Sequence, residues 1–400
     1  MKSASKSTFK DNRPLMSASP LPNLSSRTAV LLHRGGTVLR GTEAVLIRSA
    51  KALAAAGYRL VICRRNACID GPLASMEPCP EFVDFEFPEL MISGIRETSL
   101  PIPSYIAAHR KLRQLVRRSE ATLLYCSGGL PCQLAIPVAH LAKIPVLCHF
   151  HHPAPRRAHY LWLSRFADRR VFPSDFVKRH SPSGPRHPGV VVYNGIDLTR
   201  FQPAPIRDAR WRGQWGIPAE AIVIGQVGAL ARNKRPDFLI SAFGSLLNQT
   251  QRRFHLCLVG AGPMEAGLRQ LVDELGIANH VSMTGYVDDV LPYYQHVFDI
   301  NVLASSEEGL GISVIEGSAC GLPAVVSNCT GLPETIIDGA TGFLFELNDT
   351  AGLCGHLLRL GTDPSLRASM GLAGRALAEE RFSSISYDRS FMAVVDELLK

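Results

Sequence analysis

The part of the chain best suited to chemistry is residues 305–345, which hold seven glycines and several acidic residues. This segment follows a short apolar run, Ile300–Leu303, and its residues Glu308–Gly311 open a helical pattern that continues to Ala319. The first N–H groups of a helix point outward without a partner, and the helix dipole favours a negative charge beside them. Glycines also let a phosphate approach the backbone closely. The segment therefore predicts a phosphate site between a strand and a helix.

Two carboxylates of this segment, Glu308 and Glu316, lie eight residues apart. Carboxylates repel phosphate, so we expect them to serve a neutral partner such as a sugar hydroxyl, which bonds strongly to a charged acceptor. Backbone amides for a diphosphate and acids for the flanking sugars are what a nucleotide-sugar requires. The alternative is structural: Glu308 favours the start of the helix, and Glu316 is a solvated helical residue.

The elements that must position these residues alternate between short β-branched runs and longer amphipathic stretches such as Thr42–Ala56 and Ser104–Arg118. The expected strands are, in chain order, Ala29–His33, Arg59–Cys63, Thr122–Cys126, Pro145–Cys148, Arg170–Phe172, Val190–Tyr193, Ile222–Val227, His255–Val259, Val281–Thr284, Ile300–Leu303 and Ala324–Ser327. Strands that alternate with helices predict parallel sheets covered on both faces. A chain of 400 residues suffices for two doubly wound α/β domains.

Composition places the expected domain boundaries. Residues 1–27 are rich in Ser, Pro, Lys and Asn and are expected to form a disordered tail. The segment Asp197–Trp215 is rich in Pro and Arg and is the expected linker. We assign residues 28–200 to a first domain, residues 201–385 to a second, and residues 386–400 to a C-terminal helix.

The charge is unevenly distributed along the chain. Residues 1–200 carry 28 Lys and Arg against 13 Asp and Glu, whereas residues 201–400 carry 15 against 22. A basic first half suits an anionic membrane surface or a phosphate-bearing acceptor, and the alternative is a solvated basic surface. No nucleic-acid-binding motif is found, so nucleic acid is not an expected partner.

One basic segment has an amphipathic helical pattern. Read as a helix, Tyr105–Arg118 separates an apolar face from a basic one, formed respectively by Tyr105, Ala108, Leu112 and Leu115 and by Arg110, Arg113 and Arg117. The apolar face could lie in an anionic membrane interface or pack on the first sheet.

Cysteine usage and hydropathy indicate a compartment. None of the ten cysteines shows the Cys-x2-Cys spacing of a zinc site, and several lie in apolar strand-like runs. No apolar run reaches 18 residues, and the N-terminal stretch lacks the apolar core of a signal peptide. We expect a cytoplasmic protein, with peripheral contact to the inner face of the membrane as a further option.

Several motifs in a fixed order resemble glycosyltransferase family 4. The pair Glu308 and Glu316, separated by seven residues, matches the signature of that family. The other similar motifs are, in chain order, Gly41-Thr42-Glu43, Tyr193–Asp197 followed by Phe201, Val259–Pro263 and Thr284–Tyr286. The resemblance covers the chain from about Ala29 onward. It implies the GT-B fold, in which two Rossmann-like domains, one for the acceptor and one for the donor, face each other across a cleft.

The resemblance also implies roles for the matching residues. Glu316 should bind the ribose hydroxyls of the donor, Glu308 the transferred sugar, and Lys234 the diphosphate. The donor phosphates should meet the N–H groups of Leu310, Gly311 and Ile312, and the glycines placed beside the donor are Gly228 and Gly41. The chain departs from the family pattern at Ala229, where members carry an arginine. Either Arg232 replaces that charge or the donor lies differently.

Three histidines follow the strand that begins at Pro145: His149, His151 and His152. Ligands of parallel sheets bind at the carboxyl ends of strands, so these side chains should face the cleft. His151 aligns best with the family histidine beside the reacting sugar, and His149 second. The alternatives are a structural histidine and a metal site, which lacks an acidic partner nearby in the sequence.

The sequence therefore predicts a retaining, metal-independent glycosyltransferase without a cofactor. It would move a sugar from a nucleotide-sugar to a glycan or lipid-linked acceptor, with Glu308, His151 and Lys234 as catalytic residues. Lys234 and the helix N-terminus would stabilise the departing diphosphate in place of Mg²⁺. The family and the basic half favour bacterial surface polysaccharide assembly.

Three alternatives remain at this stage. A GT-B epimerase or phosphorylase shares the fold, although no persuasive pyridoxal lysine is seen. A non-catalytic nucleotide-sugar-binding protein is compatible with Ala229. A nicotinamide dehydrogenase ranks last, because the loop His33–Thr42 lacks Gly-x-Gly-x-x-Gly.

Overall fold

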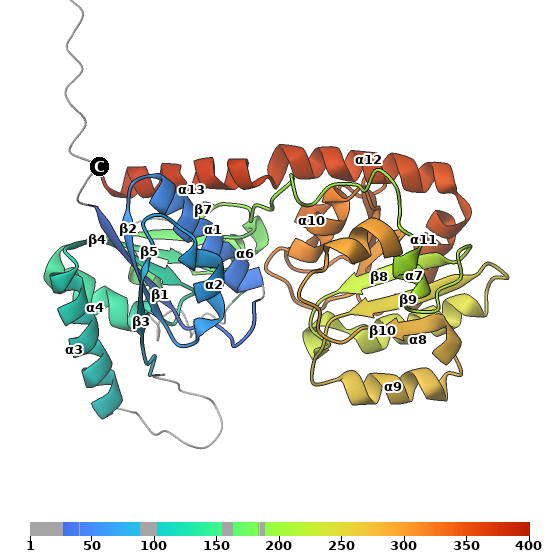
Figure 1. Ribbon diagram of the computed structural model, residues 1–400, viewed down its shortest axis with the longest axis horizontal. Coiled ribbons are helices and arrows are strands. Elements are labelled where there is room, and N and C mark those ends of the chain that lie inside the picture. Colours follow the sequence, from blue (N-terminus) through green and yellow to red (C-terminus); the bar gives the residue numbers. More distant parts are fainter. Residues whose placement is uncertain (1–26, 40, 89–101, 154–162, 183, 185–188) are drawn as a thin grey trace, which may run out of the picture.

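The structure is a computed structural model that describes residues 27–39, 41–88, 102–153, 163–182, 184 and 189–400. The expected disordered tail lies outside the described residues except for Arg27. The described chain forms two α/β domains, each built on a parallel sheet (Figure 1).

The first sheet has seven parallel strands in the order β3-β2-β1-β4-β5-β6-β7. They are β1 (Thr28–His33), β2 (Arg59–Arg64), β3 (Glu81–Asp84), β4 (Ala121–Ser127), β5 (Val146–His149), β6 (Arg169–Phe172) and β7 (Val190–Val191). The strand β1 pairs with both β2 and β4, so the order of strand addition reverses there. Ligands of open α/β sheets bind at the carboxyl ends of the strands beside such a reversal.

The second sheet has six parallel strands in the order β10-β9-β8-β11-β12-β13. They are β8 (Ile222–Val227), β9 (Phe254–Val259), β10 (Val281–Met283), β11 (Ile300–Leu303), β12 (Ala324–Ser327) and β13 (Gly342–Phe345). Here the reversal falls between β8 and β11, which pair with each other. The loops that follow these two strands carry the predicted donor residues.

Helices cover both faces of each sheet (Figure 1). Those of the first domain are α1 (Gly41–Ala55), α2 (Asp70–Ala74), α3 (Ile102–Arg118), α4 (Cys132–Ala142) and α6 (Asp175–His180), with short 3-10 turns η2 (Ala67–Ile69) and η3 (Ser164–Phe166). Those that follow are α7 (Arg210–Gly213), η4 (Arg232–Lys234), α8 (Pro236–Leu247), α9 (Glu265–Glu274), η5 (Ala278–His280), the π-helix η6 (Tyr293–Val297), α10 (Ile312–Ala319), η7 (Leu332–Thr335), α11 (Thr350–Thr362), α12 (Pro364–Arg381) and α13 (Ser384–Leu398).

All eleven expected strands are present, and two further strands were missed. The edge strand β3 has four residues, Glu-Phe-Val-Asp, with exposed acids at both ends, so it lacks an apolar run. The strand β13 lies within the glycine-rich segment, whose motif does not indicate a strand. Both strands pair with a neighbour that was predicted, so sheet pairing rather than local pattern defines them.

The last two helices connect the domains. Figure 1 shows α12 and α13 end to end along one side of both domains. The helix α12 contacts α10 in the second domain, whereas α13 contacts α1 in the first. Tyr387 and Phe391 of α13 are buried in the core of the first domain. The C-terminal helix thus packs as part of the first domain.

The chain crosses between the domains twice, at Ile196 and at Ser383, and the two crossings pair with each other. The Ile196 N–H donates to the Phe382 carbonyl at 2.9 Å, and the Ser384 N–H donates to the Ile196 carbonyl at 2.8 Å. A Cβ at Gly195 would lie 2.6 Å from the Cβ of Tyr387, so only glycine fits this close approach. The two crossing segments therefore form a single hydrogen-bonded pair between the domains.

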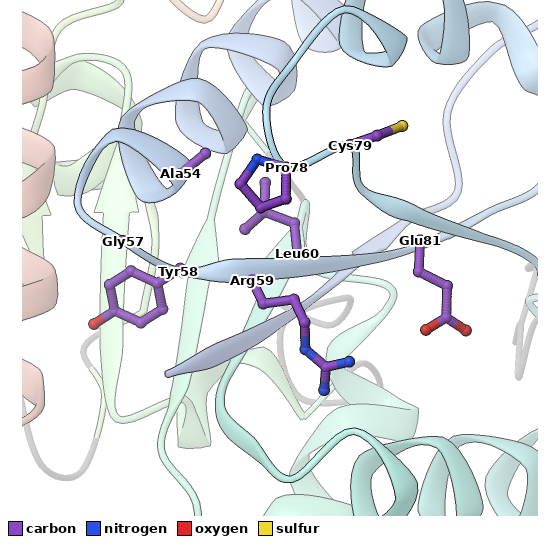
Figure 2. Close-up of a pocket in the computed structure, with 8 residues that line it drawn as sticks. All are labelled: Ala54, Gly57, Tyr58, Arg59, Leu60, Pro78, Cys79 and Glu81. Atoms are coloured by element: carbon purple, nitrogen blue, oxygen red, sulfur yellow. The ribbon is translucent and has the colours of Figure 1, made fainter. Parts of the chain in front are cut away.

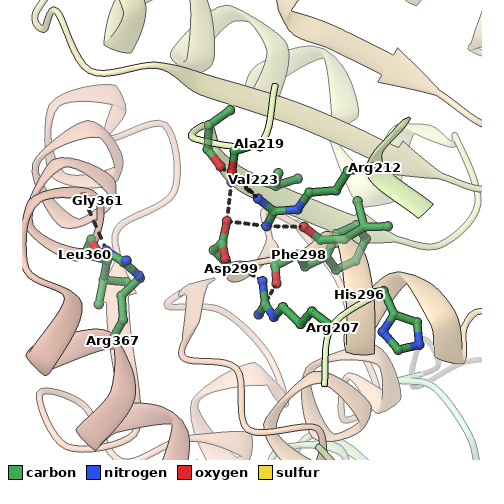
Figure 3. Close-up of polar contacts among 12 residues, drawn as sticks. Arg207, Arg212, Ala219, Val223, His296, Phe298, Asp299, Leu360, Gly361 and Arg367 are labelled. Carbon is green, nitrogen blue, oxygen red and sulfur yellow. Dashed lines mark hydrogen bonds and ion pairs between the residues drawn. The ribbon is translucent and has the colours of Figure 1, made fainter. Parts of the chain in front are cut away.

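The expected linker, Asp197–Trp215, is anchored to the second domain. Figure 3 shows Arg207 and Arg212 converging on Asp299, the residue before β11. Each guanidinium lies 2.7 Å from one carboxylate oxygen of Asp299, and Arg212 also donates to the Val297 carbonyl. These bonds fix the segment at the amino ends of the strands, away from the predicted site.

The apolar face of α3 packs inside the first domain. Ala108, Leu112 and Leu115 are buried in its core, and Tyr105 packs against them. The hypothesis that this face enters a membrane is therefore wrong, because α4 and the strand β4 already cover it. The basic residues Arg110, Arg113 and Arg117 remain exposed.

Candidate active site

The glycine-rich loop after β11 brings the second domain against the first. A Cβ at Gly309 would lie 1.9 Å from the carbonyl oxygen of His151, so the two backbones touch there. Gly331 packs equally closely, because a Cβ would lie 2.2 Å from the Gly309 carbonyl oxygen. The carboxyl ends of β5 and β11 consequently face each other at a junction that joins the two domains.

The helix α10 begins at this junction. Gly311 precedes it with a φ of 101°, a left-handed conformation that favours glycine. Among the described residues, the N–H groups of Leu310, Gly311 and Ile312 have no hydrogen-bond acceptor. These three groups and the helix dipole form the expected anion site.

Lys234 and Glu308 meet at the same place from distant parts of the sequence. Lys234 belongs to η4, which follows β8, and its Nζ forms an ion pair with Oε1 of Glu308. The Ser305 hydroxyl donates to the same oxygen at 2.8 Å, and the Glu308 N–H donates to the Thr330 hydroxyl at 2.9 Å. Glu308 is buried, so this network supports its charge.

Gly228 lies beside the Lys234 side chain, whereas the side chain of Arg232 points into solvent. A Cβ at Gly228 would lie 3.8 Å from Cε of Lys234, so the lysine chain runs alongside the turn after β8. The Arg232 side chain is exposed and has no hydrogen bond or ion pair with the described residues. Its guanidinium is free to move toward an anion near Ala229.

Glu316 points from α10 toward the π-helix η6. The Tyr294 hydroxyl donates to its Oε2 at 3.1 Å. Burial raises the pKa of this carboxyl to about 7, and the Tyr294 bond opposes that rise. Glu316 is therefore neither a solvated helical residue nor a fully charged one near neutral pH.

The structure separates the roles of the three histidines. His149 is fully buried, bonds to the Tyr125 hydroxyl at 2.9 Å and stacks on Tyr387 and Phe391. It is a core residue. His151 is only half-buried, and its Nε2 lies 2.9 Å from the Ser127 hydroxyl. It reaches the junction.

His152 and Gly41 also reach this junction. The charges that act on His152 belong to Glu308, Lys234 and Glu307 of the second domain and to Glu43 of the first. Gly41 begins α1, and a Cβ there would lie 3.2 Å from Cδ1 of Ile312. Residues from both domains therefore converge on the anion site.

Glu334 was not predicted, although it holds the domains together. Its two carboxylate oxygens accept from the N–H groups of Asp175 and Phe176, both at 2.8 Å, and from the Tyr193 hydroxyl at 3.0 Å. The Glu334 carboxylate of the second domain thus caps the amino end of α6 in the first domain. Only the folded pair of domains reveals this contact.

Two other features lie outside this site. The pocket in Figure 2 lies at the amino ends of β2 and β3, near Arg59 and Glu81, opposite the edge that carries His151. Within the described residues, no three His, Cys, Asp or Glu side chains are grouped so as to hold a metal ion.

Solved structures of similar architecture include a glycosyltransferase and a protein bound to a nucleotide-sugar. A glycosyltransferase from Rickettsia africae matches 94% of this chain and 99% of its own, with a TM-score of 0.80 and 19% identity. Anabaena Alr3699/HepE in complex with UDP-glucose matches 93% of this chain and 100% of its own, with a TM-score of 0.78 and 20% identity. The fold is GT-B, as predicted.

The sequence comparisons agree. Residues 39–200 match "Glycosyltransferase Family 4", and residues 208–377 match "Glycosyl transferases group 1". The GDP-mannose-dependent α-(1-6)-phosphatidylinositol monomannoside mannosyltransferase of Mycolicibacterium smegmatis is 30% identical over 297 residues, 70% of this chain and 77% of that protein. The chain belongs to glycosyltransferase family 4 and is an enzyme that uses a nucleotide-sugar donor.

Proposed function

We propose that this enzyme transfers a sugar to a glycan or lipid-linked acceptor with retention of anomeric configuration and without a metal ion. The observation that carries the proposal is the meeting of Lys234, Glu308 and the amino end of α10 at one junction. A lysine and three free N–H groups supply positive charge where the diphosphate departs. No step then needs a cation from solution.

The remaining groups suit the donor. Glu316 would accept hydrogen bonds from the ribose, and Glu308 from the transferred sugar. Glu308 already accepts from Lys234 and Ser305, which lowers its ability to attack the sugar as a nucleophile. We therefore favour attack by the acceptor on the face that the diphosphate leaves. Closure of the two domains would exclude water from the donor.

A transfer assay tests the proposal. The purified chain is first screened against UDP-, GDP- and ADP-sugars by thermal shift, because a bound donor stabilises the native state. Transfer to candidate acceptors is then measured in excess EDTA, and the product linkage is determined by NMR. We expect activity in EDTA and retained configuration. Loss of activity in EDTA with recovery in Mg²⁺, or an inverted product, would contradict the mechanism.

The acceptor is proposed to be membrane-bound in bacterial surface polysaccharide assembly. The relative from M. smegmatis is named for a phosphatidylinositol monomannoside substrate, which is a lipid. On this chain the exposed face of α3 carries Arg110, Arg113 and Arg117, with the exposed Ile102 and Ile106 nearer its start. No helix in the described ranges is long and apolar enough to span a bilayer.

Vesicle sedimentation tests this location. We expect binding to anionic but not neutral vesicles, weakening as salt rises, since each basic residue near the surface contributes about 1 kcal/mol. Replacing Arg110, Arg113 and Arg117 by Glu should abolish binding, whereas Arg269→Glu on α9 should not. Equal binding to both kinds of vesicle would contradict the proposal.

A further inference from the structure

A relay of four polar side chains runs from the interior of the first domain to the junction. It begins at Glu43 of α1 and passes through His33, the last residue of β1, and Ser127, the last residue of β4, to His151. The carboxylate of Glu43 lies 3.5 Å from Nε2 of His33, and Nδ1 of His33 lies 3.0 Å from the Ser127 hydroxyl. That hydroxyl lies 2.9 Å from Nε2 of His151.

The sheet itself fixes this arrangement. His33 and Ser127 are register partners in the parallel pair β1 and β4, so their side chains leave the sheet at the same level. His33 and Glu43 are each 2% exposed and Ser127 is 7% exposed. Gly35 encloses the imidazole of His33, because a Cβ there would lie 2.2 Å from Nε2. Water therefore has little access to the part of the relay formed by Glu43, His33 and Ser127.

The donors and acceptors along the relay determine which atom donates at each step. Glu43 already accepts from the Gly36 N–H at 2.9 Å. The pKa of this carboxyl is lowered to about 2 although burial raises it, because the neighbouring His33 and the Gly36 N–H together outweigh the effect of burial. Nε2 of His33 lies 3.5 Å from this carboxylate, too far for a hydrogen bond, and has no other partner among the described residues. A carboxylate attracts an N–H and repels a lone pair, so a neutral His33 turns its Nε2–H toward Glu43 and leaves Nδ1 without a proton.

The protonation of His33 determines the remaining hydrogen bonds of the relay. Ser127 has one hydroxyl proton, which it donates to Nδ1 of His33. The oxygen of Ser127 is then left to accept a hydrogen bond from the Nε2–H of His151.

The surroundings of His151, at the last step of the relay, agree with this order of donors and acceptors. Nδ1 of His151 is covered from solvent and has no hydrogen-bond partner among the described residues. Buried N–H groups without an acceptor are rarer than buried acceptors without a donor, so Nδ1 is the nitrogen that lacks the proton. The groups that face His151 are His149, His152 and His33, and burial together with these neighbours holds the pKa of His151 well below its ordinary value.

We propose that Glu43, acting through His33 and Ser127, holds His151 as a neutral imidazole with its proton on Nε2. Glu43, His33 and Ser127 are then positioning residues for the reaction. The catalytic meaning rests on the proposed function: an uncharged His151 does not repel the positive charge that develops on the sugar as its bond to the diphosphate breaks. The buried Nδ1 then carries a lone pair and no proton.

The tautomer of His151 is measured without any substrate. The full chain is labelled with [15N]histidine, and its ring nitrogens are observed by NMR at pH 8, with His151 assigned from the spectrum of a His151→Gln variant. We expect the pattern of a neutral ring protonated on Nε2. A ring protonated on Nδ1, or on both nitrogens, overturns the proposal from the wild-type spectrum alone.

Two variants of Ser127 test the relay. Ser127→Ala should convert His151 to a mixture of tautomers, whereas Ser127→Thr, which keeps the hydroxyl, should preserve the wild-type pattern. An unchanged pattern in Ser127→Ala would contradict the relay. The matched control is Ser282→Ala, because Ser282 bonds to the buried His255 at 2.8 Å in the second domain. That change should alter the signals of His255 and leave His151 unaffected.

Activity provides a separate measurement. Ser127→Ala should lower kcat by roughly tenfold, as when a residue that orients a catalytic group is removed, with a smaller change in the KM for the donor. Ser127→Thr should restore kcat. If the protein transfers no sugar at all, the proposed function fails while the tautomer result stands. If transfer occurs but the tautomer is the opposite one, only the relay fails.

Discussion

The two domains contribute to the junction in opposite ways. The second domain presents charged groups and free N–H groups from one short segment, residues 305–316. Lys234 is added from η4, which follows the neighbouring strand β8. The first domain presents an uncharged histidine whose partners come from β1, β4 and α1. The difference matches what each side would meet, a diphosphate on one and a cationic sugar on the other.

Their internal support differs as well. Glu308 is supported by direct contacts with Lys234 and Ser305, whereas His151 is supported by a relay through the interior. A substitution in the second domain should therefore act on charge and donor affinity. A substitution in the first should act on the orientation and protonation of one ring. The following predictions probe this contrast.

The largest effect is expected for Lys234→Ala. The variant removes the positive charge beside the departing diphosphate and leaves the buried Glu308 without its ion-pair partner. We expect kcat/KM to fall by about 10²–10³-fold, the range seen when a group that stabilises transition-state charge is lost. Steady-state kinetics measure it, with the exposed Lys51→Ala as control. A fall of less than threefold would remove Lys234 from the mechanism.

Glu316→Gln should weaken donor binding while making the protein more stable at pH 8. Losing a charged acceptor costs about 1.5–3 kcal/mol, or roughly 10–100-fold in donor affinity by calorimetry. The folded pKa of Glu316, about 7, lies above its ordinary 4.5, so its contribution to stability is present below pH 4.5 and is lost as the pH rises through 7.

At pH 8 the neutral amide should therefore raise the free energy of unfolding by on the order of 1–3 kcal/mol. Chemical denaturation at pH 8 and pH 4.5 separates the two effects, because the gain should disappear at the lower pH. A variant that binds the donor as tightly as the wild type does would show that Glu316 is structural.

Donor affinity should also depend on pH. If ribose binding needs the ionised carboxylate, lowering the pH from 8 to 6 takes a group with a pKa of about 7 from mostly ionised to about one-tenth ionised. The dissociation constant should rise by about tenfold across this range, and the dependence should vanish in Glu316→Gln. A wild-type profile that is flat between pH 6 and 8 would place the ribose elsewhere.

The smallest effect is expected at the contact that holds the domains together. Glu334→Gln replaces an acceptor that serves two N–H groups of α6 and the Tyr193 hydroxyl. We expect kcat/KM to fall by about 2–10-fold, the cost of one net hydrogen bond, together with a larger radius of gyration by small-angle scattering. Glu265→Gln, in an exposed ion pair with Arg269, is the control. An unchanged radius with reduced activity would point to a direct role in donor binding.

The sequence was most informative where the site is local. Glu308, Gly311 and Glu316 lie within nine consecutive residues, so a motif and helix geometry were enough to place them together. Lys234 needed the resemblance to the family, and its contact with Glu308 depends on the neighbouring strands β8 and β11. Arg232 remains an untested prediction, because its exposed side chain contacts nothing that identifies its role.

It was least informative where the contacts are distant in the sequence. Only the resemblance to the family ranked His151 above His149, because both histidines lie at the end of the same strand. The environments of the two side chains differ because His149 points into the core against Tyr387 and Phe391 of the last helix. Likewise His33 and Ser127 lie 94 residues apart, and only the register of β1 and β4 brings them together.

The sequence by itself therefore determined the fold class and the family, and it predicted the donor-side residues, because alternating periodicity and short-range motifs are properties of the local chain. The tertiary structure decided three other matters: that α13 belongs to the first domain, that the apolar face of α3 is buried, and that Glu43 connects to His151 through the interior. Each of these depends on which surfaces meet once the sheets have formed. Pairing energies between distant residues, rather than any local preference, settle that outcome.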